Sequence, residues 1–307
     1  MNGGVVLGFD TSNYKTSAAW FRPEDGAYCS RGRLLEVPAG TLGLRQSEAL
    51  FQHVRRLPEI AAAAFDGAPV LAVGYSDRPR AVEGSYMPCF LAGESAARTL
   101  ASALGVACDA WSHQQGHLAS AAFSCGRLDL LQGEFLAWHL SGGTTELLHV
   151  MPGLRCEIVG GTEDISAGQL IDRTGVLLGL PFPAGPDVDA QARMSEKQDH
   201  FTVKLREAFF SLSGVENQMR DRAARGMSAP DLCRFVLLTV AEAVRRATGA
   251  ARGQTALPVL VSGGVSANTL LRALLGDEPG VLFSQNGLGG DNALGAALLT
   301  AQREGLL

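Results

Sequence analysis

The sequence predicts an α/β protein with two similar lobes, and three observations support this class. Apolar runs rich in Val, Leu and Phe alternate with longer amphipathic segments, as is typical of α/β folds. A strand–loop–strand pattern opens the chain and starts again at residue 134. A further apolar run ends in a glycine-rich loop at 262–268. Because 307 residues can fill two separate cores, the duplicated pattern indicates two lobes with a cleft between them.

In the first half, short apolar runs bounded by polar residues predict strands at 5–10, 16–21, 26–33 and 70–74. The polar residues 11–15 form a predicted loop. A helix is predicted at 45–65 because Leu50, Val54, Leu57 and Ile60 recur on one face, and another at 89–104.

In the second half, the same patterns predict strands at 134–140, 146–151, 156–159 and 258–261. Helices are predicted at 166–178, 231–247 and 293–301. We therefore expect an N-terminal lobe of residues 1–133, completed by the C-terminal helix 290–307, and a second lobe of residues 134–289.

Composition favours a cytoplasmic protein with no membrane segment. No apolar stretch approaches the roughly 20 residues that span a bilayer, and no signal-peptide pattern opens the chain. The six cysteines occur singly, which favours reduced thiols. A net charge of −5 gives no overall attraction for nucleic acid, so an RNA partner requires a local patch or a helper protein. Arg220, Arg222 and Arg225 are a candidate patch, with a solvated helix face as the alternative.

The segment 113–117 contains two histidines four residues apart, followed by a helix-like run. On a helix, His113 and His117 would lie on one face, where both imidazoles can reach one metal ion. Asp291 precedes the last predicted helix and is the candidate third ligand. Three such ligands leave coordination positions open for a substrate oxygen. The alternative is that the histidines cap or pack a helix.

Three loops that follow strands carry Gly, Ser, Thr, Asp or Asn: 10–13, 141–145 and 262–264. Glycines let several backbone N–H groups converge on an anion, and hydroxyls add donors for phosphate oxygens. Asp10 can hold a metal through water. None of these loops has the Rossmann or P-loop spacing, so we expect a nucleotide cleft of another type.

Together these motifs resemble those of the TsaD-type family of tRNA threonylcarbamoyladenosine transferases, whose members carry the older names glycoprotease and O-sialoglycoprotein endopeptidase. The resemblance covers nearly the whole chain. It rests on Gly8–Ser12, His53-Val54-Arg55, His113–His117, Leu140–Leu147, Ala167-Gly168, Asp172-Arg173, Pro183–Pro186, Phe210–Gly214, Gly263–Asn268 and Asp291-Asn292.

The resemblance implies the two-lobed actin-like ATPase fold of actin, sugar kinases and heat-shock chaperones, with nucleotide and metal in the cleft between the lobes. It implies transfer of the threonylcarbamoyl group from threonylcarbamoyl-adenylate to adenosine of tRNA, an acyltransferase reaction. One divalent ion, iron or zinc, would be held by His113, His117 and Asp291. The adenine nucleotide or acyl-adenylate would contact Ser141, Gly142, Gly143, Asp172, Gly185 and Asn268. The implied partners are tRNA, TsaB-like and other proteins of the same pathway, and no membrane.

Several positions depart from the family pattern near the expected reaction centre. Gln115 stands where the family has Glu, Lys15 replaces an acidic residue, and Thr144 replaces a histidine. We take Asp10, Lys15 and Gln115 as the candidate catalytic residues. The departures suggest a diverged paralogue. The alternative functions are therefore a carbamoyltransferase with another acceptor, or a non-catalytic regulatory partner that binds nucleotide and metal.

Overall fold

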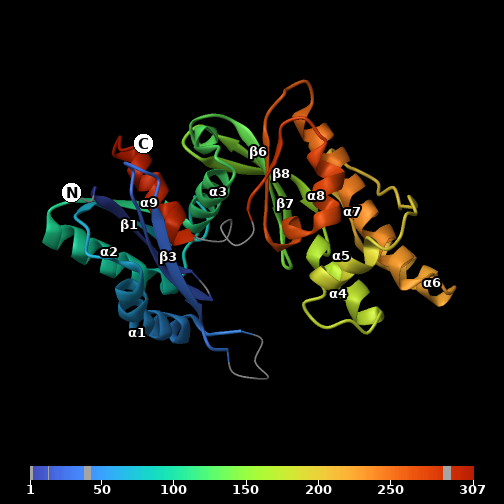
Figure 1. Cartoon of the computed structure of the whole chain (residues 1–307), viewed down its shortest axis with the longest axis horizontal. Helices are drawn as coiled ribbons and strands as arrows, with labels where there is room; N and C mark the ends of the chain where they lie inside the picture. Colours follow the sequence, from blue (N-terminus) through green and yellow to red (C-terminus); the bar gives the residue numbers. More distant parts are fainter. Residues whose placement is uncertain (1–2, 13, 38–42, 286–291) are drawn as a thin grey trace. The chain divides into compact units, whose positions relative to one another are not determined.

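The computed structural model describes residues 3–12, 14–37, 43–285 and 292–307, and the chain divides into two compact units (Figure 1). Unit 1 is Met1–Phe123 with Gly287–Leu307, and unit 2 is Ser124–Asn286. The first boundary between the units lies at 123/124, whereas the predicted boundary between the lobes lies at 133/134.

Unit 1 is a mixed sheet with helices on both faces. Its elements are β1 (Val5–Ser12), β2 (Lys15–Phe21), β3 (Tyr28–Leu34), α1 (Gln46–Ala64), β4 (Val70–Arg78), η1 (Pro88–Phe90), α2 (Leu91–Leu104), β5 (Ala107–Ser112), α3 (His113–Ser124) and α9 (Asn292–Arg303). The strand order is β3-β2-β1-β4-β5. The first three strands in sequence pair antiparallel, and β4 lies parallel between β1 and β5.

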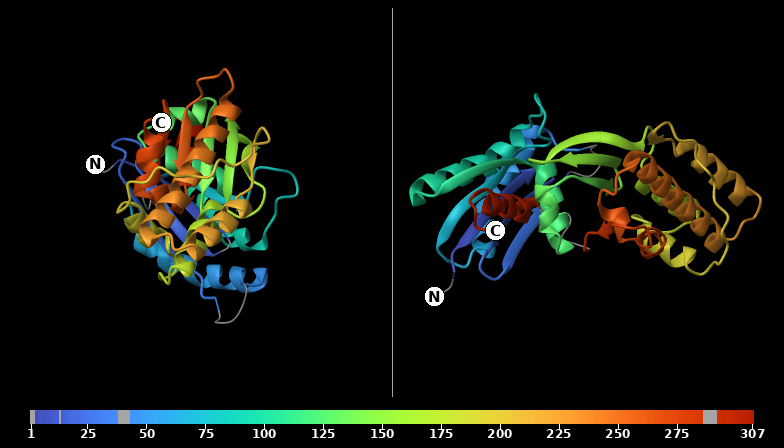
Figure 2. Two further views of the ribbon diagram at one scale, coloured as in Figure 1. Left: turned by 90° about the vertical axis from the view of Figure 1, so that its right-hand side faces the viewer. Right: turned by 90° about the horizontal axis from the view of Figure 1, so that it is seen from above.

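The core of unit 1 lies between this sheet and helices α1 and α2. Leu7 and Phe9 of β1 pack in one cluster with Leu57 and Ile60 of α1 and with small residues of α2. Because strand side chains alternate, the other face of β1 carries Gly8. There α9 contacts β1, β4 and β2 (Figure 2).

Glycine allows α9 to approach the sheet at backbone distance. A Cβ added to Gly8 would lie 1.9 Å from the Ala293 carbonyl oxygen, and one added to Gly74 would lie 2.4 Å from that of Ala296. A side chain at either strand position would therefore push the helix away from the sheet.

Unit 2 repeats this plan with more helices. Its elements are η2 (Leu128–Gln132), β6 (Phe135–Leu140), β7 (Thr145–Met151), β8 (Arg155–Thr162), α4 (Ala167–Leu177), α5 (Gly185–Ala192), β9 (Ala208–Phe210), α6 (Ser213–Ala224), α7 (Ala229–Arg252), β10 (Val259–Ser262), η3 (Gly264–Ala267), α8 (Thr269–Gly276) and β11 (Val281–Phe283). The strand order is β11-β10-β6-β7-β8-β9, with β6, β10 and β11 parallel and β6, β7 and β8 antiparallel.

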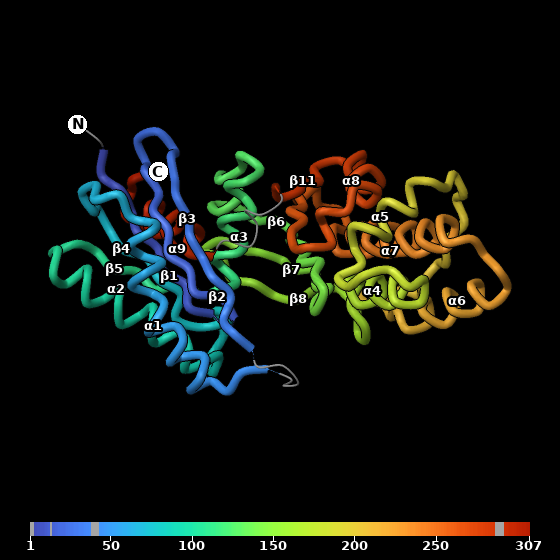
Figure 3. The backbone as a smooth tube through the Cα atoms, turned by 60° about the horizontal axis from the view of Figure 1, so that its bottom comes forward, coloured from blue at the N-terminus to red at the C-terminus, as the bar shows by residue number. Residues whose placement is uncertain are grey.

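Helix α7 is the centre of the unit 2 core. It packs against α5, which runs beside it in Figure 3, and against α4, α6 and α8. Phe235, Val236 and Val240 of α7 cluster with Trp138 and Leu140 of β6. Trp138 satisfies its buried indole N–H by donating to Thr248 Oγ1 at 2.8 Å.

The α/β class and the two-lobed plan are confirmed, and most predicted elements are present with shifted ends. Two details of the prediction are wrong. Thr11 and Ser12 belong to β1 rather than to a loop, because Ser12 pairs directly with Lys15 of β2. The buried face of α1 contains Ala49, His53, Leu57, Ile60 and Ala64, so Val54 is exposed.

The contact between Gly8 and α9 predicts a large effect of a single methyl group. We expect Gly8→Ala to lower the free energy of unfolding by on the order of 3 kcal/mol, because the new Cβ meets backbone atoms of α9. Urea denaturation measures this. Gly249→Ala is the matched control, since Gly249 lies in α7 with nothing near its Cβ position. The control should be neutral or slightly stabilising. Equal stability of Gly8→Ala and wild type would contradict the packing described here.

Candidate functional site

The two predicted metal ligands in the described residues lie together at the start of α3 in unit 1. The Nε2 atoms of His113 and His117 are 3.1 Å apart. Two nitrogens that bind one ion at about 2.1 Å are separated by about 3.0–3.4 Å. The helical prediction for this segment is confirmed, and the spacing of the imidazoles fits a shared ion.

Asp10 lies behind His113 at the end of β1. Its Oδ2 accepts a hydrogen bond from His113 Nδ1 at 2.9 Å, and its Oδ1 accepts from the backbone N–H and hydroxyl of Ser12. Burial alone would raise the pKa of Asp10, but the His113 imidazole and the bond from Ser12 outweigh it and hold the pKa well below its usual range. Since an ionised carboxylate can only accept, the neutral form of His113 carries its proton on Nδ1, and in that form the Nε2 lone pair is available to a metal.

The start of α9 reaches His113. Asn292 Nδ2 lies 3.4 Å from His113 Nε2, and the Asn292 Oδ1 is buried with no hydrogen-bond partner in the described part of the chain. This approach depends on Gly116 and Gly295, because a Cβ on Gly295 would lie 2.0 Å from the Gly116 carbonyl oxygen. Asp291, the predicted third ligand, lies outside the described residues. Within the described ranges no cluster of three or more His, Cys, Asp or Glu side chains could hold a metal.

Gln115 caps the N-terminus of α3, a role that the sequence analysis does not predict. Its Oε1 accepts hydrogen bonds from the backbone N–H of Ser112 at 2.8 Å and from the Ser112 hydroxyl at 3.1 Å. The Gln115 N–H donates in return to Ser112 Oγ at 3.2 Å. These bonds form a capping box at the start of α3, a motif that takes Glu or Gln at this position. The spacing Ser112-x-x-Gln115 was the available signal.

Lys15, the other predicted catalytic residue, is placed at the first position of β2. Its Cε lies over Gly32 of β3, 2.5 Å from the position of an added Cβ. Its ammonium group makes no ion pair or hydrogen bond with the residues that the structure describes.

In unit 2, the predicted turn at 141–144 joins β6 to β7 and is held from both sides. The Ser141 N–H donates to the Thr144 carbonyl at 2.8 Å, and the Gly142 carbonyl accepts from Ser166 Oγ at 2.7 Å. Ser166 also caps α4. Gly168 in the first turn of α4 allows this contact, because an added Cβ would lie 2.5 Å from the Ser141 carbonyl oxygen.

Four of the predicted nucleotide contacts line one cavity of about 560 Å³ in unit 2. The complete lining is Gly142, Gly168, Ile171, Asp172, Pro183, Gly185, Pro186, Asp189, Arg193, Gly264, Val265, Ala267 and Asn268. Ser141 and Gly143 flank Gly142 in the turn. This size suits a small-molecule ligand, and the loops 141–145 and 262–268 of the sequence analysis meet at it.

Most polar side chains of this cavity accept hydrogen bonds from backbone N–H groups at the N-termini of helices. Asp172 Oδ1 accepts from the Ala184 N–H at 2.9 Å, just before α5. Asp189 accepts from the N–H groups of Thr269 and Leu270, both at 3.1 Å, at the start of α8. Asn268 Oδ1 accepts from Leu271 N–H at 2.9 Å. The Asn268 Nδ2 is buried without a partner among the described residues, so it is a donor suited to a ligand.

The two α/β units, each a mixed sheet packed with helices, have the architecture of the actin-like ATPase fold. Solved structures support the fold alone. The HypF structure in its phosphate- and nucleotide-bound form matches with a TM-score of 0.61 and 13% identity, over 97% of this chain and 55% of that chain. Component A of the Acidaminococcus fermentans (R)-2-hydroxyglutaryl-CoA dehydratase matches with a TM-score of 0.58 and 14% identity, over 99% of this chain and 100% of that chain.

The chain belongs to the TsaD family, described as tRNA N6-adenosine threonylcarbamoyltransferase, whose model matches residues 48–295. A family member from Thermus thermophilus is 32% identical over 310 residues, covering 97% of this chain and 92% of the relative. One from Streptococcus pneumoniae is 29% identical, covering 95% of this chain and 90% of the relative. Membership of this family makes the protein an acyltransferase.

The capping box predicts how α3 responds to substitution. Gln115→Ala should lower the free energy of unfolding by about 1 kcal/mol, because the Ser112 N–H loses its acceptor. Gln115→Glu should retain most of the stability, since a carboxylate accepts the same bonds and is favoured at a helix N-terminus. Urea denaturation of both variants checks this. A Gln115→Ala protein as stable as Gln115→Glu would contradict the capping role.

His53 predicts a pH-dependent stability. Its side chain is fully buried on α1, with Nδ1 2.8 Å from Thr16 Oγ1 of β2. Burial, helped by the Arg56 charge and opposed by Asp10, lowers the pKa of His53 to about 4, from 6.5 for an ordinary histidine. Between about pH 4 and pH 6.5, His53 is therefore protonated in the unfolded chain and neutral in the folded chain. The free energy of unfolding decreases as the pH falls through this range.

Between about pH 8 and pH 5, we expect protonation of His53 in the unfolded chain to lower the free energy of unfolding by about 2 kcal/mol. Urea denaturation across this range, on wild type and His53→Gln, isolates the contribution. The variant should show a shallower pH dependence than wild type. Identical slopes would mean that His53 is not the buried neutral histidine described here.

Proposed function

We propose that this protein transfers the threonylcarbamoyl group from threonylcarbamoyl-adenylate to the N6 amine of an adenosine in tRNA. The family match over residues 48–295 carries the proposal, and relatives named for this reaction align along nearly the whole chain. The geometry adds two independent features that such a reaction can use: a paired-imidazole site in unit 1 and a glycine-lined cavity in unit 2.

The cavity in unit 2 is the proposed site of the adenine nucleotide or acyl-adenylate. The proposed contacts are Ser141, Gly142, Gly143, Asp172, Gly185 and Asn268. Gly142, Gly143 and Gly185 leave open space where a Cβ would stand, so a ligand can approach their backbone closely. The unpartnered Asn268 Nδ2 supplies a donor for an acceptor atom of the ligand.

One divalent metal ion, iron or zinc, is proposed at His113 and His117, with Asp291 as the third ligand. The 3.1 Å spacing of the two Nε2 atoms and the Asp10 carboxylate behind His113 support this assignment. When bound, such an ion supplies Lewis-acid polarisation of a carbonyl oxygen. The protein's own part is to hold both imidazoles in place: Asp10 orients His113, and the Gln115 cap fixes the first turn of α3.

These contacts also bear on the departures from the family pattern. The capping box accepts Gln as readily as Glu, so Gln115 is compatible with retained activity. Asp10 acts as a positioning residue for His113. A role for Lys15 in catalysis stays a prediction.

We propose tRNA as the macromolecular substrate, bound with the help of TsaB-like and related proteins of the same pathway. The net charge of −5 supports the need for helpers, because the chain has no overall attraction for a polyanion. We place the reaction in the cytoplasm, in keeping with the absence of disulfides among the described cysteines. Over the described residues, no helix is long and apolar enough to cross a membrane.

The experiment is reconstituted transfer: protein, pathway partners, adenylate and tRNA, with threonylcarbamoyladenosine quantified in digested tRNA. Wild type should modify tRNA, and His117→Ala should lose about 100-fold or more of the rate because the ion loses a ligand. His200→Ala is the control, because His200 is exposed in unit 2 and its one hydrogen bond to the described part of the chain is a local bond to the Gln198 carbonyl. Unmodified tRNA under conditions where another family member succeeds would overturn the proposal in favour of a paralogue with another acceptor or a regulatory role.

A further inference from the structure

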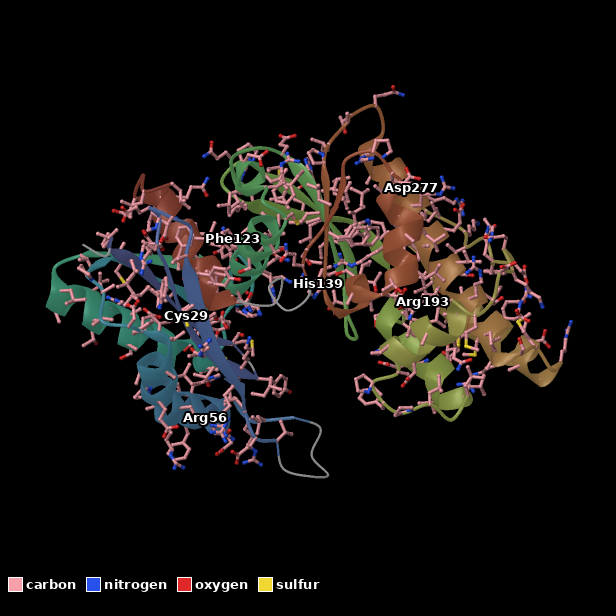
Figure 4. The ribbon with its side chains drawn as sticks, in the orientation of Figure 1. Cys29, Arg56, Phe123, His139, Arg193 and Asp277 are labelled. Atoms are coloured by element: carbon pink, nitrogen blue, oxygen red, sulfur yellow. The ribbon has the colours of Figure 1, made fainter. Side chains whose placement is uncertain are left out.

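The cavity in unit 2 has one basic side chain among its described lining residues, that of Arg193, which directly follows α5 (labelled in Figure 4). Its Nε lies 3.7 Å from Asp189 Oδ2, one helical turn earlier, and 56% of its side chain is exposed. This distance is too long for a hydrogen bond, and the Arg193 side chain makes none with any residue that the structure describes. The N–H donors of the guanidinium are therefore available to a ligand in the cavity.

The ion pair with Asp189 is a weak structural reason for an arginine at this position. An exposed ion pair without a hydrogen bond stabilises a protein very little. Asp189 also has other partners, because its Oδ2 accepts from the Thr269 N–H and its Oδ1 from the Leu270 N–H, both at 3.1 Å. The carboxylate therefore attracts the guanidinium by charge alone, and this keeps Arg193 at the cavity wall without using its donors.

A second unused donor lies in the same part of the cavity wall. Asn268 directly precedes Thr269, whose N–H bonds to Asp189, and the buried Asn268 Nδ2 has no partner among the described residues. Val265 and Ala267 of η3 come just before Asn268 and add apolar lining. This part of the wall therefore combines hydrogen-bond donors with apolar side chains, which suits a flat ring that carries acceptor nitrogens.

The charges favour a base over a phosphate beside Arg193. Because Asp189 balances the charge of Arg193, a phosphate placed against the guanidinium would also meet a carboxylate. The turn at 141–144 offers a phosphate a better place, since it carries no acidic side chain and since Gly142 and Gly143 leave open space where a Cβ would stand. That turn is held against the start of α4 by Ser166, whereas Arg193 follows α5.

We propose that Arg193 binds the adenine ring of the adenylate, with Asn268 Nδ2 as a second donor; this rests on the function proposed above, which brings an adenylate to the cavity. A guanidinium can stack on the face of a nucleobase or donate to its ring nitrogens. Asp189 is a positioning residue that keeps the guanidinium at the wall. Arg193 thereby determines which end of the adenylate enters this part of the cavity, and the acyl phosphate is directed to the 141–144 turn.

Binding of AMP and of adenosine to the full chain, measured by isothermal titration calorimetry, tests this contact. Adenosine lacks the phosphate, so a contact with the base must affect both ligands equally. We expect Arg193→Ala to raise the Kd of AMP and the Kd of adenosine by the same factor, about 10-fold or more. Arg193→Lys should recover little of this loss, because an ammonium keeps the charge but lacks the planar group that stacks and donates along one edge.

Arg220→Ala is the matched control. Arg220 of unit 2 is equally exposed and pairs with Glu216 four positions earlier, but it is not one of the described residues that line the cavity. It should bind both ligands as wild type does, and circular dichroism should show every variant folded. Unchanged affinities in Arg193→Ala would overturn the proposal. A loss confined to AMP, full recovery in Arg193→Lys, or a wild type that does not bind adenosine would also overturn it.

Because these binding measurements need no tRNA, they separate this proposal from the proposed function. If Arg193→Ala weakens AMP and adenosine equally while wild type leaves tRNA unmodified, the proposed transfer is wrong and the adenine contact stands. If wild type modifies tRNA while Arg193→Ala keeps the wild-type affinity for AMP, the adenine contact is wrong and the proposed transfer stands.

Discussion

The hydrogen bond between Asp10 and His113 is the interaction on which the candidate metal site depends. It joins the end of β1 to the first residue of α3, across 103 positions of sequence, and the carboxylate is almost completely buried. A buried carboxylate is costly unless it is paired, and here His113 and Ser12 together satisfy it. The same bond fixes the tautomer of His113, so one contact both stabilises unit 1 and directs a lone pair towards His117.

Three local arrangements keep that bond in place. Ser112 and Gln115 cap α3, so its first turn and both imidazoles are held without help from a ligand. Gly116 and Gly295 bring α9 against α3 at backbone distance, which places Asn292 beside His113. Gly8 and Gly74 bring α9 against the sheet that carries Asp10. The glycine of the histidine motif is thus explained by helix packing, and Gln115 by capping.

The sequence was sufficient for features that depend on local spacing. The four-residue spacing of His113 and His117 predicts that they share a helix face, and the short apolar runs predict most of the strands. The Asp10–His113 bond could not be predicted, because it depends on how β1 and β5 pair with β4. The spacing of Ser112 and Ser166 to a glutamine three residues later predicts both capping boxes, although the position of Gln115 between the two histidines also fits a catalytic role. Thr11 and Ser12 are predicted as a loop because both are polar, but they are the buried end of β1.

If Asp10 acts through His113, the metal affinity of the Asp10→Asn variant must change. An amide can still meet His113 Nδ1, but it carries no charge and can present its NH₂ instead of its oxygen. Zinc affinity should be measured by competition with a chromophoric chelator, with circular dichroism confirming that the variant is folded. We expect the affinity of Asp10→Asn for zinc to fall by about 10- to 100-fold. A folded Asp10→Asn protein that binds zinc as tightly as wild type would contradict it.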